Sequence, residues 1–144
     1  MMAKVSIRGA GQLAGDFAAL ERAERGPTLR KGSRAGAKVA QRAIKARAPK
    51  RLGKMARGIV LGSERSSSPS RQATTTVTLS KRTYQYEGQR KSAAMVGRMV
   101  ELGTQHMAAD PFFRPGFDGA EAGIVSEVES AIAGAIDGVL MGAR

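Results

Sequence analysis

The sequence predicts an α+β fold: a small, mostly antiparallel sheet packed with a long basic helix and an amphipathic C-terminal helix. Two segments, residues 28–46 and 121–140, carry apolar residues at helical spacing. A third segment, residues 72–81, alternates between two faces as a half-buried strand does. The expected order of elements is helix, helix, strands, helix. This order favours helices and strands in separate runs over a βαβ alternation.

The N-terminal part is expected to open with a short strand, "KVSI" at residues 4–7, and to continue as a helix in "GQLAGDFAALERAER". The Gly-Pro pair at residues 26–27 ends that helix. Its apolar residues, which fall near one side, are Leu13, Phe17, Ala18 and Leu20.

The longer helix at residues 28–46 combines an apolar face with a basic one. Its apolar positions at helical spacing are Val39, Ala40, Ala43 and Ile44. Pro49 disfavours helix at Ala48 and is expected to stop it there. Basic residues advance by four, four, four and three positions and form one stripe, called here the basic stripe: Arg30, Arg34, Lys38, Arg42 and Lys45.

Two segments, "MARGIVLGS" at 55–63 and "QATTTVTLSK" at 72–81, are expected to pair as a hairpin. The Ser-rich residues 63–72 between them predict a long, flexible tip, and residues 83–93 predict a second flexible polar loop. The segment "AMVGRMVELG" at 94–103 is expected to be a third strand or an irregular apolar segment.

The C-terminal helix has the clearest signal. Asp118 followed by Glu121 fits a capping box at its start. Gly134 and Gly138 each lower helix propensity by about 1 kcal/mol relative to Ala, and they would let another element approach closely. The apolar residues that recur every four positions are Ile124, Val128, Ile132, Ile136 and Leu140.

Length and composition limit the architecture. The 144 residues fit a single domain, residues 1–144. Much of the 42% hydrophobic fraction is Ala, and the chain has 18 Gly, so the core should be thin. Partner chains would then supply part of the burial. There is no Cys, no apolar run long enough to cross a membrane and no signal-like N-terminus. We therefore expect a soluble protein made in a cytoplasm.

The net charge of +12 is concentrated in one part of the chain. Residues 1–60 hold 15 Lys/Arg and 3 Asp/Glu, whereas residues 61–144 hold 9 of each. Residues 25–57 contain twelve basic residues and no acidic one. Since intrahelical pairs that would balance this charge are missing, the segment predicts a docking surface for an anionic partner, either nucleic acid or an acidic protein face.

No constellation of residues predicts catalysis, a metal or a cofactor. Gly9, Gly11 and Ala14 match G-x-G-x-x-A, but position 29 is Leu where a dinucleotide site needs an acidic residue. His106 is the sole histidine and cannot build a multi-histidine metal site. The expectation is a protein that is not an enzyme and that carries no cofactor.

The stretch "VELGTQHMAADPFFRPGF", residues 100–117, holds three of the four Phe residues. Two prolines fix φ around them, which predicts a rigid plug. Phe112 and Phe117 are expected to cover the open end of the sheet and to hold the start of the last helix. Arg114 is expected to point outward or to pair with an acidic group such as Glu101.

Together with "ARAPKRLGKMARGIV", this stretch resembles the tail-component family of long-tailed bacteriophages, whose members act as tail-completion or head–tail joining proteins. Family members typically carry a long helix ending in "A-P", then a Gly and a hydrophobic strand. They close with "E-x-G-T" and "P-F-x-R-P" before a final helix. The most specific matching residues here are Glu101, Gly103, Thr104, Pro111, Phe112, Phe113, Arg114, Pro115 and Phe117.

The resemblance implies a structural protein of the virion, assembled in the host cytoplasm. Its expected state is a homo-oligomeric ring between the portal-side connector and the tail tube, with a channel for the genome. Such channels are commonly lined with negative charge in this family. The basic stripe is therefore expected to dock on an acidic neighbour, either the adjacent subunit or a connector or tail ring. The alternative is a sequence-independent DNA-binding protein that contacts phosphates through residues 25–57.

Overall fold

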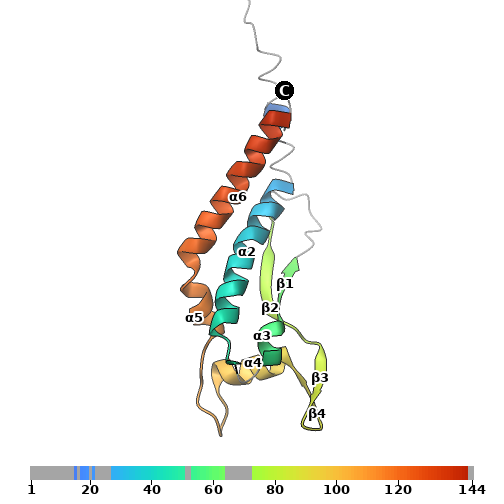
Figure 1. The fold of residues 1–144 in the computed structure, drawn as a ribbon, viewed down its shortest axis with the longest axis vertical. Coiled ribbons are helices and arrows are strands. Elements are labelled where there is room, and N and C mark those ends of the chain that lie inside the picture. Colours follow the sequence, from blue (N-terminus) through green and yellow to red (C-terminus); the bar gives the residue numbers. More distant parts are fainter. Residues whose placement is uncertain are drawn as a thin grey trace, which may run out of the picture.

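The computed structural model describes residues 27–50, 53–63 and 73–142, together with Gly15, residues 17–19 and Glu21. Two long helices lie side by side along the long axis, with strands beside one of them and a short helix across one end (Figure 1). The α+β class predicted from the sequence is confirmed. The expected strand at 4–7, the G-x-G-x-x-A turn and most of the tip at 63–72 lie outside the described residues.

Helix α2, Pro27–Arg47, packs along helix α6, Glu121–Gly142. The two run antiparallel, because Gly32 lies against Ile132 while Gly36 lies against Val128 and Ile124 (Figure 1). A Cβ added at Gly36 would lie within 3.1 Å of the Ile124 side chain. The close approach of the helices therefore depends on glycines of α2.

The opposite side of α2 contacts an antiparallel pair of strands, β1 (Ile59–Ser63) and β2 (Thr75–Leu79). The expected alternation is confirmed in β2, where Thr75, Val77 and Leu79 are half-buried and the residues between them are exposed. Two polar contacts join helix and strands. Gln41 Nε2 donates to the Ile59 carbonyl at 2.7 Å, and Ser33 Oγ donates to Thr75 Oγ1 at 2.9 Å.

Two segments differ from their expected structure. Residues 55–57 belong to a short helix, α3 (Gly53–Arg57), so the strand begins only at Ile59. The expected loop at 83–93 is a hairpin of β3 (Thr83–Tyr86) and β4 (Gln89–Ser92) that is not part of the β1–β2 sheet. Its two-residue turn has positive φ at both Glu87 and Gly88, the geometry that closes tight hairpins.

The expectation of a third strand or an irregular segment at 94–103 is wrong: helix α4, Ala93–Leu102, occupies this segment. Ser92 caps it by accepting a hydrogen bond of 3.2 Å from the Met95 amide. The buried residues Ala93, Gly97 and Val100 follow helical spacing, and Gly97 allows contact with the Leu79 side chain. Gly97 thus serves close packing between α4 and β2.

The start of the C-terminal helix also differs from its prediction. Asp118 is the last residue of a separate short helix, α5 (Phe113–Asp118), and is not the N-cap of α6. The junction is closed by backbone bonds, with the Ala120 amide donating to the Phe117 carbonyl at 3.0 Å. Gly134 and Gly138 have no atom within 4 Å of an added Cβ, so no described element of this chain approaches α6 there.

The core lies where α2, α3, β1, α4 and the start of α5 meet. Its largest fully buried side chains are Ile44, Met55 and Ile59. By contrast, α6 has no buried residue in its 22 positions. The thin core predicted from the composition is therefore concentrated at one end, and α6 contributes half-buried side chains alone. Within the described ranges, no helix has the length and apolar character to cross a membrane.

Candidate interaction surfaces

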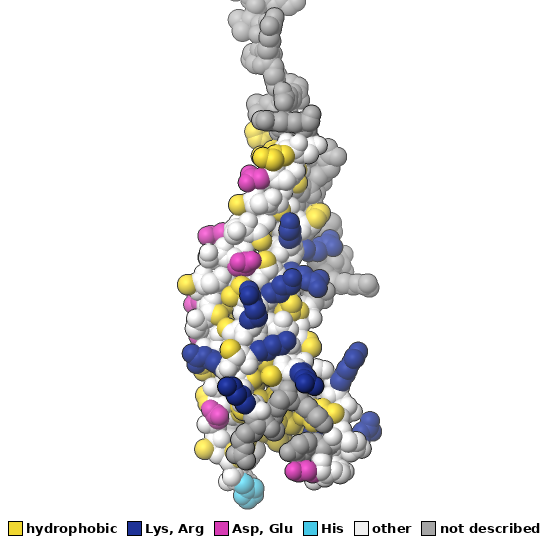
Figure 2. Space-filling model, in the orientation of Figure 1, with side chains coloured by type: hydrophobic (Ala, Val, Ile, Leu, Met, Phe, Trp, Pro, Cys, Tyr) yellow, Lys and Arg dark blue, Asp and Glu magenta, His cyan; other side chains and the backbone are white. Residues whose placement is uncertain are grey.

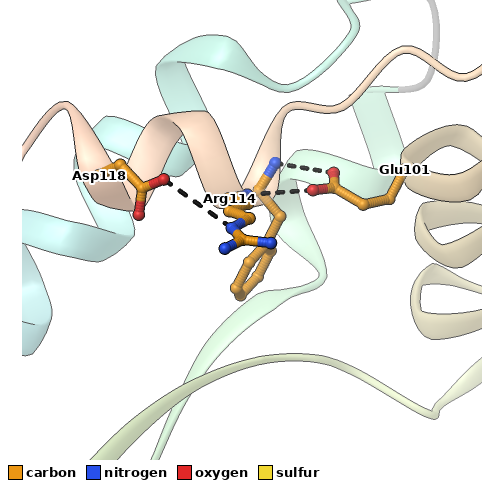
Figure 3. Close-up of polar contacts among 4 residues, drawn as sticks. Glu101, Arg114 and Asp118 are labelled. Atoms are coloured by element: carbon orange, nitrogen blue, oxygen red, sulfur yellow. Dashed lines mark hydrogen bonds and ion pairs between the residues drawn. The ribbon is translucent and has the colours of Figure 1, made fainter.

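The Glu101 carboxylate joins α4 to the start of α5. Oε2 accepts hydrogen bonds from the backbone amides of Phe112 and Phe113, both at 2.9 Å. Oε1 accepts one from the Arg114 amide at 3.1 Å, and Figure 3 shows the Glu101 carboxylate directed toward the backbone at Arg114. The N-cap residue of α5, Phe112, makes no side-chain cap of its own. Glu101 therefore supplies the cap from another helix, and the negative charge faces the positive end of the α5 backbone.

This arrangement sets the protonation of Glu101. Partial burial raises the pKa of Glu101, but the backbone hydrogen bonds from Phe113, Arg114 and Phe112 together outweigh it and hold the pKa below its ordinary value. The carboxylate is therefore charged throughout the neutral range. We assign it a structural role.

The residues between Glu101 and Pro111 form a tight turn. Gly103 has φ of 74°, in the left-handed region that favours glycine, and ends α4. Thr104 and Met107 exchange backbone hydrogen bonds of 2.8 and 3.3 Å, which close the turn. His106 is exposed on it, as is Pro111. The motif Glu101, Gly103 and Thr104 thus shapes the connection from α4 to α5.

The aromatic residues divide between core and surface. Phe112 is 2% exposed and belongs to the buried core cluster that includes Ile44 and Val100. The ring of Phe113 meets the Phe112 ring edge-on, with 6.3 Å between the ring centroids. Phe117 is 46% exposed, so its expected place over the sheet is wrong. The reason is that the segment is helical, and Gly116 is the residue that faces α2. A Cβ at Gly116 would lie 2.9 Å from Ile44 Cα.

Arg114 points outward, as expected, but its partner differs. Its Nε lies 4.0 Å from Asp118 Oδ2, an i,i+4 pair within α5, and both side chains are largely exposed (Figure 3). Glu101 instead binds the Arg114 backbone. Such an exposed pair contributes little to stability. Pro115, half-buried, occupies the first turn of α5, where its missing amide hydrogen has no helical partner to lose.

The basic stripe lies on the face of α2 directed away from the core. Arg30, Arg34, Lys38 and Arg42 are exposed and Lys45 is half-buried. Figure 2 shows Lys and Arg side chains gathered along the visible face of α2, with acidic side chains along the neighbouring edge over α6. Within the described part of the chain, none of these five residues lies within 4.0 Å of a carboxylate. Within the described residues the stripe is therefore uncompensated.

A second surface was missed by sequence reasoning. The solvent side of α4 carries Met95, Met99 and Leu102, all exposed, and Met107 is exposed on the adjacent turn. The first three, called here the apolar stripe, are spaced i, i+4, i+7. That helical signal was present in the sequence, but the strand expected at 94–103 obscured it. Exposed apolar groups at such spacing are typical of protein-binding surfaces.

A third surface lies where α5 meets α6. A shallow, open hollow of about 630 Å³ is lined by α6 side chains and by the end of α5. Val125, 50% exposed, lies among three carboxylates there. We call this the acidic face of α6; its lining residues are Asp118, Gly119, Glu121, Ala122, Val125, Ser126 and Glu129.

The described residues hold no cluster of His, Cys, Asp and Glu that could bind a metal ion. Their distinctive features are surfaces: the basic stripe, the apolar stripe and the acidic face. No protein-family model, curated protein or solved structure matches this chain significantly.

Proposed function

We propose that this chain is a structural protein of the virion of a long-tailed bacteriophage. It would act at the head–tail junction as a subunit that forms or completes an oligomeric ring at the top of the tail. The ring would leave a channel for the genome. The proposal rests on the sequence resemblance, and one structural observation carries it further: a small protein with a thin core exposes a basic and an apolar surface on different helices.

A ring subunit at a junction must contact its neighbours in the ring and the assemblies above and below it. Separate surfaces of different chemistry suit that requirement. The basic stripe on α2 favours an acidic partner, and the apolar stripe on α4 favours an apolar one. Helix α4 lies across one end of the molecule (Figure 1), so a partner that binds its exposed apolar stripe would contact that end.

Co-sedimentation with purified tail tubes and purified connectors tests the proposal. The wild-type chain should pellet with at least one of them. Met95→Asp with Met99→Asp should reduce that binding strongly, because two charges would enter an apolar contact. A matched control places the same two charges at Thr76 and Thr78, which are exposed on β2. A wild-type chain that pellets with neither assembly would contradict the proposal.

A second candidate function is sequence-independent DNA binding through the basic stripe. The observation in its favour is that the five basic side chains have no ion pair within the described residues. Affinity for duplex DNA should then fall linearly with log salt, with a slope of about −0.9 for each phosphate contacted. Binding that is absent near physiological salt, or unaffected by Arg34→Glu with Lys38→Glu, would exclude it.

A further inference from the structure

We propose that the acidic face of α6 in one copy of this chain docks on the basic stripe of α2 in a second copy. This inference rests on the homo-oligomer in the proposed function and names the two faces that meet. Within each copy the two surfaces are on neighbouring helices, with basic side chains along α2 and acidic side chains toward α6 (Figure 2).

The two helices carry opposite charges. Helix α2 carries seven Lys/Arg and no acidic residue, and α6 carries four Asp/Glu and no basic residue. Although α2 and α6 pack together, no ion pair joins them in the described residues. Both sets of charges are therefore available to another molecule. A second copy offers acidic side chains of α6 to the basic α2 and basic side chains of α2 to the acidic α6.

Much of α6 remains exposed among the described residues. None of its 22 residues is buried, although its inner side contacts α2. Val125 is half exposed in the acidic face, and the adjoining Ala122 and Ser126 are small. Long Lys and Arg side chains can lay their apolar stems over Val125 while their charged ends reach the carboxylates at its rim.

The lengths of the two surfaces are compatible. The basic stripe, from Arg30 to Lys45, extends over about 22 Å at 1.5 Å per residue. The helical part of the acidic face, from Glu121 to Glu129, extends over about 12 Å, and Asp118 lengthens it at the α5 end. One copy can thus place its whole acidic face within the basic stripe of the next.

In the proposed ring each copy uses its acidic face on one neighbour and its basic stripe on the other, so the contact is heterologous. A heterologous contact repeats from copy to copy and yields a closed ring or a filament. Because exposed ion pairs individually contribute little, the charges chiefly set orientation and partner choice. The association should accordingly weaken as salt rises.

Cross-linking tests the contact directly, since the chain has no native Cys. Arg34→Cys and Ser126→Cys variants are mixed in equal amounts and treated with a short bismaleimide. The mixture should form heterodimers, whereas either variant alone should remain uncross-linked. Gln85→Cys mixed with Ser126→Cys is the control, because residue 85 is exposed on the β3–β4 hairpin. The inference would be overturned if the yield of heterodimer were no greater than in this control. It would also be overturned if Arg34→Cys cross-linked mainly with itself.

Charge reversal gives a second, independent measurement by sedimentation velocity at low salt. Arg34→Glu with Lys38→Glu should weaken self-association about tenfold or more, and so should Glu121→Lys with Glu129→Lys. All four changes in one chain should restore association. Controls are Lys81→Glu with Arg82→Glu, exposed between β2 and β3 and part of neither face, and Glu127→Lys, on α6 outside the acidic face. Failure of the fourfold variant to recover would count against the contact.

The outcomes separate this inference from the proposed function. If the chain binds tails or connectors but the cross-link and the charge-swap rescue both fail, the inference is wrong and the proposed function stands. If the cross-link and rescue succeed but no binding to tails or connectors occurs, the inference stands and the proposed function is wrong.

Discussion

The Phe112 amide donates a hydrogen bond of 2.9 Å to Glu101 Oε2, across eleven residues of sequence. The amides of Phe113 and Arg114 also donate to this carboxylate, so Glu101 serves as the N-terminal cap of α5. This contact fixes where α5 begins, and therefore how Phe112 enters the core and how Gly116 meets α2.

Removing the charge of that cap should destabilise the fold. Glu101→Gln keeps the size of the side chain but replaces one acceptor oxygen with a donor group that faces backbone amides. We expect the free energy of unfolding to fall by about 1–3 kcal/mol, since hydrogen bonds to a charged group are lost. Urea unfolding at neutral pH measures the change. The control is Asp110→Asn, which removes an exposed carboxylate nearby and should change stability little.

The same cap predicts a pH dependence. Because the pKa of Glu101 is lower in the folded protein than its ordinary value of 4.5, the unfolded chain takes up the proton first as pH falls. The stabilisation is therefore complete above the unfolded pKa and is lost as pH drops through the folded one. The difference in unfolding free energy between wild type and Glu101→Gln should be constant above about pH 5.5 and shrink below about pH 4.5. A difference that grows on acidification would contradict this sign.

The two end phenylalanines of "PFFRPGF" should respond very differently to truncation. Phe112→Ala empties a buried site beside Ile44 and Val100 and should cost about 3–5 kcal/mol. Phe117→Ala removes a ring that is nearly half exposed and should cost far less. Thermal unfolding of both variants, measured under the same conditions, compares them. Equal losses would show that Phe117 is buried after all.

Glycine-to-alanine changes should have opposite signs in α5 and α6. At Gly116 the new methyl group would meet the backbone of Ile44, and we expect a net loss of about 1–2 kcal/mol despite better helix propensity. At Gly134 nothing lies within 4 Å, so alanine should raise the free energy of unfolding by up to about 1 kcal/mol. Chemical unfolding of the two single variants measures both effects. A stabilised Gly116→Ala would mean that α5 lies farther from α2.

Much of the fold could be predicted from local patterns. The spacing of apolar residues determined α2 and α6, and the alternation in residues 75–79 determined the strand β2. The spacing of the basic residues by three or four positions likewise determined the exposed face of α2, because charges without partners remain in solvent. In each case the periodic pattern is long enough to predict the element without knowing which other elements pack against it.

Tertiary contacts decided how the segment from 83 to 118 packs and where its helices are capped. Gly97 lowers helix propensity, yet α4 forms because that glycine packs against Leu79 and the inward residues reach the core. Asp118 matches a capping pattern, yet α5 is capped by Glu101 from a different helix. The sequence by itself determined which residues favour burial and which favour solvent. Long-range packing and the hydrogen bonding of backbone amides determined which residues come into contact, because those contacts join residues far apart in the chain.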